Sequence, residues 1–381
     1  MELFEHQRIA LGKLRTGSIL VGGVGSGKSR VGLAYWEKEE KPKKLYIITT
    51  AKKRDSKEWE EECAPFAISD VVIDSWNQIR KYVGVKDAFF LFDEDKVCGY
   101  GAWVKAFLKI VKNNTWLVLT ATPGDTWMDY IPVFIANGFY KNKTEFIRRH
   151  VVFSRTTKFP KVERFLEVHH LERLRDSITV FMAYNKTTIS HHEWINVGFD
   201  EEMFGTVRTG RWNPFEKRPI KDAAELYYLM RKVVNSDPRR IDTVMQLLDL
   251  HPRAIIFYNF NYELDMLVNL CYDLGVPYAQ WNGRKHEPIP DTENWVYLVQ
   301  YAAGAEGWNC IETDTVIFYS QNYSYKAVIQ AAGRIDRLNT LFTDLFYYHL
   351  RSVSFIDTAI KSAYDRKKNF NEPRRMPELS H

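Results

Sequence analysis

The 381-residue sequence has few cysteines, no long apolar run and no short internal repeat. Its cysteines are Cys63, Cys98, Cys271 and Cys310, and none forms a CxxC pair, which argues against a zinc cluster or a disulfide framework. No apolar run reaches the ~18 residues that a membrane-spanning helix needs. The start, MELFEHQRIA, lacks the basic and then apolar segments of a secretory signal. These absences predict a soluble protein of the cytoplasm with no membrane partner. We also expect the protein to be a monomer.

Charge and histidine content give little functional information by themselves. The formal net charge is +5, which is compatible with a polyanionic partner but too small to indicate one. The adjacent pairs His169–His170 and His191–His192 have no acid or cysteine at ligand spacing, so the sequence does not predict a cluster of metal ligands.

The order of apolar and amphipathic segments predicts an α/β fold with two domains, since the chain exceeds the usual ~100 to 200 residues of one domain. Short β-branched or aromatic runs alternate with amphipathic segments, as in parallel sheets flanked by helices. Strands are expected at 19–21, 45–49, 71–74, 89–92, 116–119, 254–258, 295–299, 316–319 and 346–349. Strand signals thin out in the polar and basic region 153–237, where we place the junction between domains 1–185 and 186–381.

The segment GGVGSGKSR predicts a phosphate-binding loop. Gly22, Gly27, Lys28 and Ser29 satisfy the pattern GxxxxGK[ST], with a strand-like segment before it and a helix-like one after it. Backbone N–H groups of such a loop surround phosphate groups, the lysine reaches the β and γ phosphates, and the serine hydroxyl ligates Mg²⁺. We therefore expect ATP and Mg²⁺ as ligands, with the rest of the loop, Gly23, Val24, Gly25 and Ser26, also contacting the nucleotide.

The segment FFLFDEDK ends an apolar strand with adjacent acids. At the carboxyl edge of a sheet, Asp93 is expected to hold Mg²⁺ together with Ser29, and Glu94 to orient and deprotonate the attacking water. Further along, LTATPGD follows another apolar strand, and its two threonine hydroxyls are expected to hydrogen-bond the loop of these acids. In QAAGRIDR, the spacing of Gln330, Arg334 and Arg337 predicts one face of a helix.

Taken in order, GVGSGKS, DEDK, TATP and QAAGRIDR resemble motifs I, II, III and VI of superfamily 2 helicases and translocases. The likeness covers most of the chain and is closest to Swi/Snf-type and phage-like DEAD/DEAH-related DNA helicases, since ITTAKKRDSKEWEEE resembles motif Ia and YAAGAEGWN resembles motif V. The resemblance implies two RecA-like domains with ATP in the cleft between them. It implies that Arg334 and Arg337 stabilise the transition state from the second domain, with Gln330 beside them.

The resemblance also implies where nucleotide and nucleic acid bind. Gln7 in FEHQ corresponds to a glutamine that contacts adenine, and Gly307 to a nucleotide-contacting position. Implied nucleic-acid contacts are Thr49, Thr50, Lys52, Lys53, Ser75, Trp76, Asn259, Phe260, Gly304 and Trp308. For Trp76, Phe260 and Trp308 core packing is an equal alternative to stacking on bases, and Lys52 and Lys53 could be solvated loop charges.

The sequence therefore predicts an ATP-dependent DNA helicase or translocase that binds single-stranded or forked DNA with little sequence preference. A phage-type role in replication or recombination, with proteins of those pathways as partners and the host cytoplasm as location, is part of this expectation. Alternatives are a duplex translocase that does not separate strands, an RNA helicase, and a nucleic-acid-binding scaffold with a regulatory ATP site. Two positions depart from common patterns: Lys96 in motif II, and Ala331, which is typical of Swi/Snf-type proteins and favours DNA over RNA.

Overall fold

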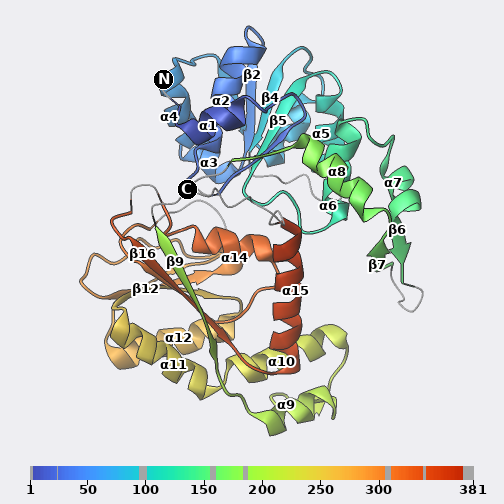
Figure 1. The fold of residues 1–381 in the computed structure, drawn as a ribbon. Helices are drawn as coiled ribbons and strands as arrows, with labels where there is room; N and C mark the ends of the chain where they lie inside the picture. Colours follow the sequence, from blue (N-terminus) through green and yellow to red (C-terminus); the bar gives the residue numbers. More distant parts are fainter. Residues whose placement is uncertain are drawn as a thin grey trace, which may run out of the picture. The chain divides into compact units, whose positions relative to one another are not determined.

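The structure is a computed structural model that describes residues 3–23, 25–93, 101–154, 160–182, 188–304, 310–337 and 340–371. It divides into two compact units, Met1–Asn185 and Lys186–His381. Each unit is built on a six-stranded sheet with helices on its faces (Figure 1). The predicted α/β class, with a parallel sheet in each of two units, is confirmed. Across the described ranges, every helix is too short or too polar to span a bilayer.

The first unit contains eight strands and eight α-helices in its described part. Its strands are β1 (Ile19–Val21), β2 (Leu45–Thr49), β3 (Val71–Ser75), β4 (Phe89–Asp93), β5 (Thr115–Thr120), β6 (Val151–Phe153), β7 (Val162–Phe165) and β8 (Thr179–Phe181). Its α-helices are α1 (Glu5–Leu11), α2 (Lys28–Tyr35), α3 (Ala51–Asp55), α4 (Glu58–Cys63), α5 (Ala102–Val111), α6 (Trp127–Ala136), α7 (Lys143–His150) and α8 (Val168–Ile178). Shorter helical turns are η1 (Trp36–Glu40), η2 (Ala64–Phe66) and η3 (Trp76–Tyr82).

The main sheet of the first unit has the strand order β3-β2-β4-β5-β1-β8, and all its pairs are parallel. Its central strands are apolar on both faces, as expected of a parallel sheet covered on both sides. One face packs against α1, α2 and α4. On the other face, Phe107 of α5 contacts the rings of Phe92 and Trp116. All strands point the same way, so the loops after β1, β4 and β5 meet at one edge.

The second unit is built in the same way. Its strands are β9 (Ile189–Asn196), β10 (Trp212–Asn213), β11 (Arg218–Pro219), β12 (Arg253–Tyr258), β13 (Tyr278–Trp281), β14 (Trp295–Gln300), β15 (Thr315–Phe318) and β16 (Asp344–Arg351). Its helices are α9 (Glu201–Arg208), α10 (Ala223–Asn235), α11 (Pro238–Leu250), α12 (Asn261–Leu274), α13 (Tyr301–Gly304), α14 (Tyr325–Ala332) and α15 (Phe355–Asn371).

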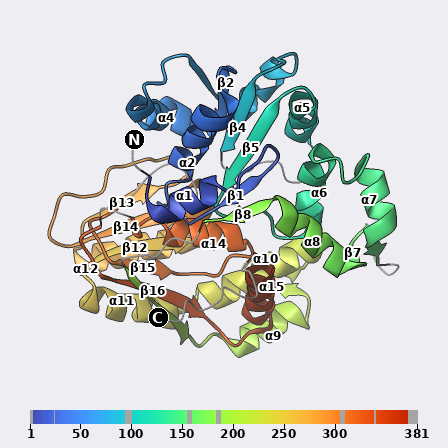
Figure 2. The ribbon, with the colours of Figure 1, turned by 45° about the horizontal axis from the view of Figure 1, so that its top comes forward.

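The second sheet has the order β13-β14-β12-β15-β16-β9, again with parallel pairs throughout (Figure 2). Alternate residues of β12 face opposite sides. Ala254, Ile256 and Tyr258 pack with α11 and α12, whereas Ile255 and Phe257 pack with α14. Figure 1 shows α11 and α12 on one side of this sheet and α14 on the other.

All nine expected strands are present, with ends within one or two residues of the prediction. No strand was expected in the region 153–237, because its strand signals are weak. Two strands of this region, β8 and β9, nevertheless complete the two main sheets. β9 is a polar edge strand, ISHHEWIN, with mostly exposed side chains, and among the described strands its one partner is β16. Since an edge strand need not bury either face, its sequence carries no apolar alternation. The four-residue strand β13 was also not predicted.

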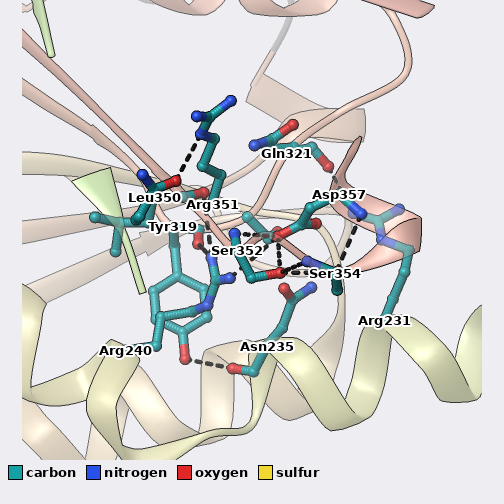
Figure 3. A network of polar contacts seen from close by, with 12 residues as sticks. Arg231, Asn235, Arg240, Tyr319, Gln321, Leu350, Arg351, Ser352, Ser354 and Asp357 are labelled. Carbon is teal, nitrogen blue, oxygen red and sulfur yellow. Dashed lines mark hydrogen bonds and ion pairs between the residues drawn. The ribbon is translucent and has the colours of Figure 1, made fainter. Parts of the chain in front are cut away.

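A buried polar network at the carboxyl edge of the second sheet fixes the surrounding helices (Figure 3). Arg240 of α11 is fully buried, and its Nη1 donates to the carbonyl oxygens of Tyr319 and Leu350 at 2.6 and 3.2 Å. Its Nη2 lies 3.4 Å from Oδ2 of Asp357 in α15, which also accepts hydrogen bonds from the backbone and hydroxyl of Ser352. Because buried charges are tolerated when paired and hydrogen-bonded, this network holds α11 and α15 to the ends of β15 and β16.

Candidate active site

The predicted phosphate loop connects β1 to α2. Gly27 adopts a left-handed backbone with φ 79° and caps α2, which begins at Lys28. The first N–H groups of a helix are unpaired within it and point toward an anion at this end. Nζ of Lys28 donates to the carbonyl oxygens of Gly22 and Gly23 at 2.7 and 2.8 Å, so the ammonium group is held against the loop.

At two glycines of this loop, a Cβ atom would fit only if a neighbouring side chain moved. A Cβ atom at Gly22 would lie 2.6 Å from Oγ of Ser26, and one at Gly27 would lie 2.3 Å from Nε2 of Gln7. Gly25 also has a positive φ of 78°. A tight, glycine-dependent loop that leads into a helix N-terminus beside a lysine fits a nucleoside triphosphate, so the residues present suit the predicted ligand.

Gln7 lies against the phosphate loop. Its side chain is 2% exposed, Nε2 donates to the carbonyl oxygen of Ser26 at 3.4 Å, and Oε1 accepts from the backbone N–H of Phe4 at 3.0 Å. The amide therefore connects α1 to the loop. Its contact with adenine stays a prediction.

Asp93 ends β4 at the same sheet edge as the phosphate loop, with β5 between β4 and β1. The side chain is almost fully buried. Its Oδ2 accepts hydrogen bonds from Thr49 Oγ1 (2.8 Å), Lys53 Nζ (3.0 Å) and Trp59 Nε1 (3.2 Å). Oδ1 accepts no hydrogen bond from any part of the chain that the structure describes. An oriented carboxylate with one oxygen available suits a hydrated Mg²⁺ that Ser29 would also ligate.

The residues around Asp93 include several for which the resemblance implied nucleic-acid contact. Thr49, Ser75 and Trp76 are at most 2% exposed. Nε1 of Trp76 donates to the backbone oxygen of Asp93 at 2.9 Å, so for this ring the structure agrees with the core-packing alternative. Thr49 and Trp76 therefore position the acid.

The neighbouring candidates of motif Ia differ in environment. Thr50 is buried and caps α3 by accepting a hydrogen bond from the N–H of Lys53. The Lys53 ammonium pairs with Asp93, while Lys52 is half-buried on α3. Lys52 and Lys53 are both half-buried, and the nucleic-acid contacts of Thr50, Lys52 and Lys53 stay predictions.

Trp59 is a site residue that motif reasoning did not single out. It lies in α4, and with Ser29 and Lys53 it borders a cavity of about 250 Å³. Glu62 lines the same cavity, and burial raises the pKa of its carboxyl group. The tryptophan of EWEEE was the available sequence signal, but a tryptophan in a helix is usually a core residue.

In the part of the chain that the structure describes, the threonines of TATP form no hydrogen bond to Asp93. Oγ1 of Thr120 accepts from the backbone N–H of Thr122 at 3.1 Å, within the same loop. Oγ1 of Thr122 is buried without a hydrogen-bond partner. The rest of the loop after Asp93 lies outside the described residues, so hydrogen bonds from these threonines to it stay a prediction. Five positions considered in the sequence analysis lie outside the described residues, and what was predicted of them stays a prediction: Val24, Glu94, Lys96, Gly307 and Trp308.

In the second unit, Asn259 and Phe260 follow β12 and are held by the buried Glu263. Its Oε2 accepts from the N–H groups of Asn259 and Phe260 and from the hydroxyl of Ser320. The Phe260 ring stacks on Tyr262 and lies 4.7 Å from the Arg231 guanidinium. Glu263 thus fixes the loop that carries two predicted nucleic-acid contacts. Gly304 ends α13.

The prediction that Gln330, Arg334 and Arg337 share one helical face is wrong. Gln330 lies in α14, but that helix ends at Ala332 and is capped by Gly333. Glycine favours termination because it stabilises helix interiors poorly. Arg334 follows in a turn, with its side chain 6% exposed and its carbonyl oxygen accepting from Cys310 N–H at 3.1 Å. Both arginines still belong to one short segment, and their action on ATP stays a prediction.

The Asp93 contacts predict that Thr49→Val raises the Mg²⁺ concentration needed for half-maximal ATP hydrolysis by about 10- to 100-fold, as loss of a supporting hydrogen bond at metal sites typically does. Valine keeps the shape of threonine but removes the hydroxyl that orients Asp93. The measurement is a Mg²⁺ titration of ATPase activity. Thr115→Val is the control. The hydroxyl of Thr115 also donates to a carboxylate, that of Glu40, but Thr115 begins β5 and so lies at the sheet edge opposite to the phosphate loop. An unchanged titration for Thr49→Val would show that Asp93 needs no such support.

Comparison with known proteins shows similarity to remodeling ATPases. The chain is 30% identical over 96 residues to the ISWI chromatin-remodeling complex ATPase ISW2 of Saccharomyces cerevisiae, a match covering 23% of this chain and 9% of that protein. It is 23% identical over 196 residues to the lymphoid-specific helicase of Homo sapiens, covering 42% of this chain and 23% of that protein. The matches thus span less than a quarter of these relatives. No family model matches.

These relatives are named as an ATPase and a helicase, so the sequence matches agree with the predicted class of enzyme, an ATP hydrolase. Within that class, the chain is similar to superfamily 2 ATPases of the Swi/Snf type, as its motifs indicate. Among solved structures, the Sulfolobus solfataricus SWI2/SNF2 ATPase core in complex with dsDNA matches with a TM-score of 0.44 and 16% identity, over 97% of this chain and 92% of that chain.

Proposed function

We propose that this protein is a DNA-dependent ATPase that moves along duplex DNA. The observation that carries the proposal is the sequence similarity to chromatin-remodeling ATPases, because chromatin presents duplex DNA to such enzymes. The phosphate loop and Asp93 at one sheet edge supply a suitable site for ATP. A second unit with a parallel sheet of its own supplies the second body that a motor needs.

In this proposal Lys28 neutralises charge on the β and γ phosphates, and Ser29 and Asp93 hold Mg²⁺. Bound Mg²⁺ would lower the charge on the phosphate oxygens. Glu94 orients and deprotonates the attacking water. Arg334 and Arg337 stabilise the charge that develops on the γ phosphate, so that hydrolysis requires the two units to close and product release lets them open.

Strand separation is the second candidate activity, and the similarity to a protein named a helicase favours it. It would suit single-stranded or forked DNA and a role in phage-type replication or recombination, with the enzyme acting as a monomer in the cytoplasm of the host. The alanine at position 331 favours DNA over RNA in either case.

The two activities are distinguished by a triplex-displacement assay run beside a fork-unwinding assay, both with ATP. A duplex translocase displaces the third strand and leaves the fork paired, and this is the expected result. Fork opening would replace the proposal with a helicase. Lys28→Ala is the control for both assays, since it removes the proposed ATP contact. Activity in neither assay, with no stimulation of ATP hydrolysis by DNA, would contradict both motor functions.

A further inference from the structure

A short β-hairpin of the second unit concentrates positive charge. Strands β10 and β11 pair in an antiparallel manner between α9 and α10. The segment around them, RTGRWNPFEKRPIK at 208–221, contains five arginine or lysine residues and only one acid, Glu216. None of these residues belongs to the motifs that predict the ATP site or the nucleic-acid contacts.

The hairpin is held firmly against α10. Asn213 is buried, and its Oδ1 accepts from the N–H groups of Phe215 and Glu216 at 3.0 and 3.1 Å, which shapes the turn. Arg218 forms a forked ion pair with Glu225 of α10, and this hydrogen bonding lowers the pKa of Glu225 to about 2. The charge of Arg218 is thus neutralised, and the pair serves to hold the hairpin in place.

Three other cations of the segment are left for a partner. Arg211, Lys217 and Lys221 are exposed, and none forms an ion pair with a described residue. Arg211 and Lys217 have φ angles of 55° and 52°, in the left-handed region that favours glycine or asparagine. Long cationic side chains at two such positions cost conformational free energy, which points to a use for the charge.

Aromatic rings lie among these cations. Trp212 is 40% exposed and makes no contact with another ring or with a cation in the described structure. Phe215 is 41% exposed, and Nζ of Lys232 lies 4.1 Å from its ring centroid. An indole with an open face beside unpaired cations has the chemistry of a surface that stacks a base and binds the neighbouring phosphates.

We propose that this basic hairpin, defined by Arg211, Trp212, Phe215, Lys217 and Lys221, binds a nucleic-acid strand. The three cations contact phosphates and Trp212 stacks on an unpaired base. An acidic protein would also suit the cations, but the open indole favours nucleic acid. The basic hairpin lies outside the motifs that predict the other nucleic-acid contacts. The proposal rests on the proposed function in one respect, namely that the partner is a nucleic acid.

The test measures binding of the full-length protein to labelled single-stranded and duplex oligonucleotides by fluorescence anisotropy, without nucleotide, over a series of salt concentrations. For R211A/K217A/K221A, the slope of log affinity against log salt is expected to fall by about two to three, roughly one for each lost phosphate contact. The control K13A/K86A/K112A removes the same charge from exposed residues of the first unit that form no ion pair with a described residue, and should keep the wild-type slope.

The indole is tested separately. Trp212→Ala is expected to weaken binding of the single strand by about 5- to 100-fold, the range for loss of one stacked base, with a smaller effect on duplex. Trp212→Phe should restore most of the affinity because it keeps a stacking ring. Thermal unfolding of each variant establishes that the fold is retained.

Unchanged affinity and salt slope in both R211A/K217A/K221A and Trp212→Ala would overturn the proposal and leave an acidic protein as the partner to test. Because binding is measured without ATP, failure of the proposed motor function would appear in the ATPase and displacement assays of the wild-type protein. The two failures can therefore be told apart.

Discussion

Replacing Lys28 by alanine is expected to abolish ATP hydrolysis stimulated by nucleic acid, with a loss of at least about 10²- to 10³-fold. Removal of a preorganised charge from the phosphate site has effects of this size. The fold should survive, because Nζ of Lys28 donates to the carbonyl oxygens of Gly22 and Gly23 and the side chain is not part of the apolar core of its unit. The measurement is the ATPase rate with and without duplex DNA, beside thermal unfolding.

Lys13→Ala is a matched control, because Lys13 is exposed in the same unit and lies outside the phosphate loop. It should hydrolyse ATP at the wild-type rate. Substantial turnover by Lys28→Ala would remove this loop from the catalytic site. A wild-type rate that does not respond to DNA would count against a motor even if the variant is inactive.

Replacing Arg334 by alanine is expected to preserve ATP binding while reducing turnover by up to about 10³- to 10⁵-fold, the range for arginines that act on phosphoryl transfer. Such an arginine interacts with charge that develops only in the transition state, so its loss lowers kcat more than it weakens binding. Arg334→Lys should also be slow, because lysine keeps the charge but lacks the planar fork of guanidinium.

ATP affinity, measured with a fluorescent nucleotide, and kcat, measured at saturating ATP, separate these effects. Equal losses of affinity and rate in Arg334→Ala would instead assign the residue to ground-state binding. Since Arg334 is buried, thermal unfolding of both variants must accompany the kinetics. Arg284→Ala, at an exposed position of the same unit, is the control for loss of one guanidinium group.

Much of the fold could be predicted because parallel strands are buried on both faces. Runs such as FFLF and RAIIFY are apolar without interruption, and they form β4 and β12. The edge strand β9 could not be found in this way, because its side chains are mostly exposed and its pairing with β16 joins segments about 155 residues apart. Helix α14 also ended earlier than the spacing of its polar residues predicted.

The candidate site was predictable where its chemistry lies in one short segment. The turn at Gly27 and the helix start at Lys28 follow from the local sequence, since glycine tolerates a left-handed backbone and a strand precedes the turn. The surroundings of Asp93 were not predictable. Thr49, Lys53 and Trp59 reach it across 34 to 44 residues of chain, from three different elements. Their order along the chain does not reveal that their hydrogen bonds converge on one oxygen.

By itself, then, the sequence determined the α/β class, the position of nearly every central strand, and the phosphate loop with its following helix. These depend on burial pattern and local backbone preference, which neighbouring residues encode. Only the tertiary structure decided which side chains hold Asp93, which strands close the edges of the two sheets, and which cations of the hairpin are left unpaired. Those features depend on distances between remote segments, and such distances arise only when the sheets and helices pack.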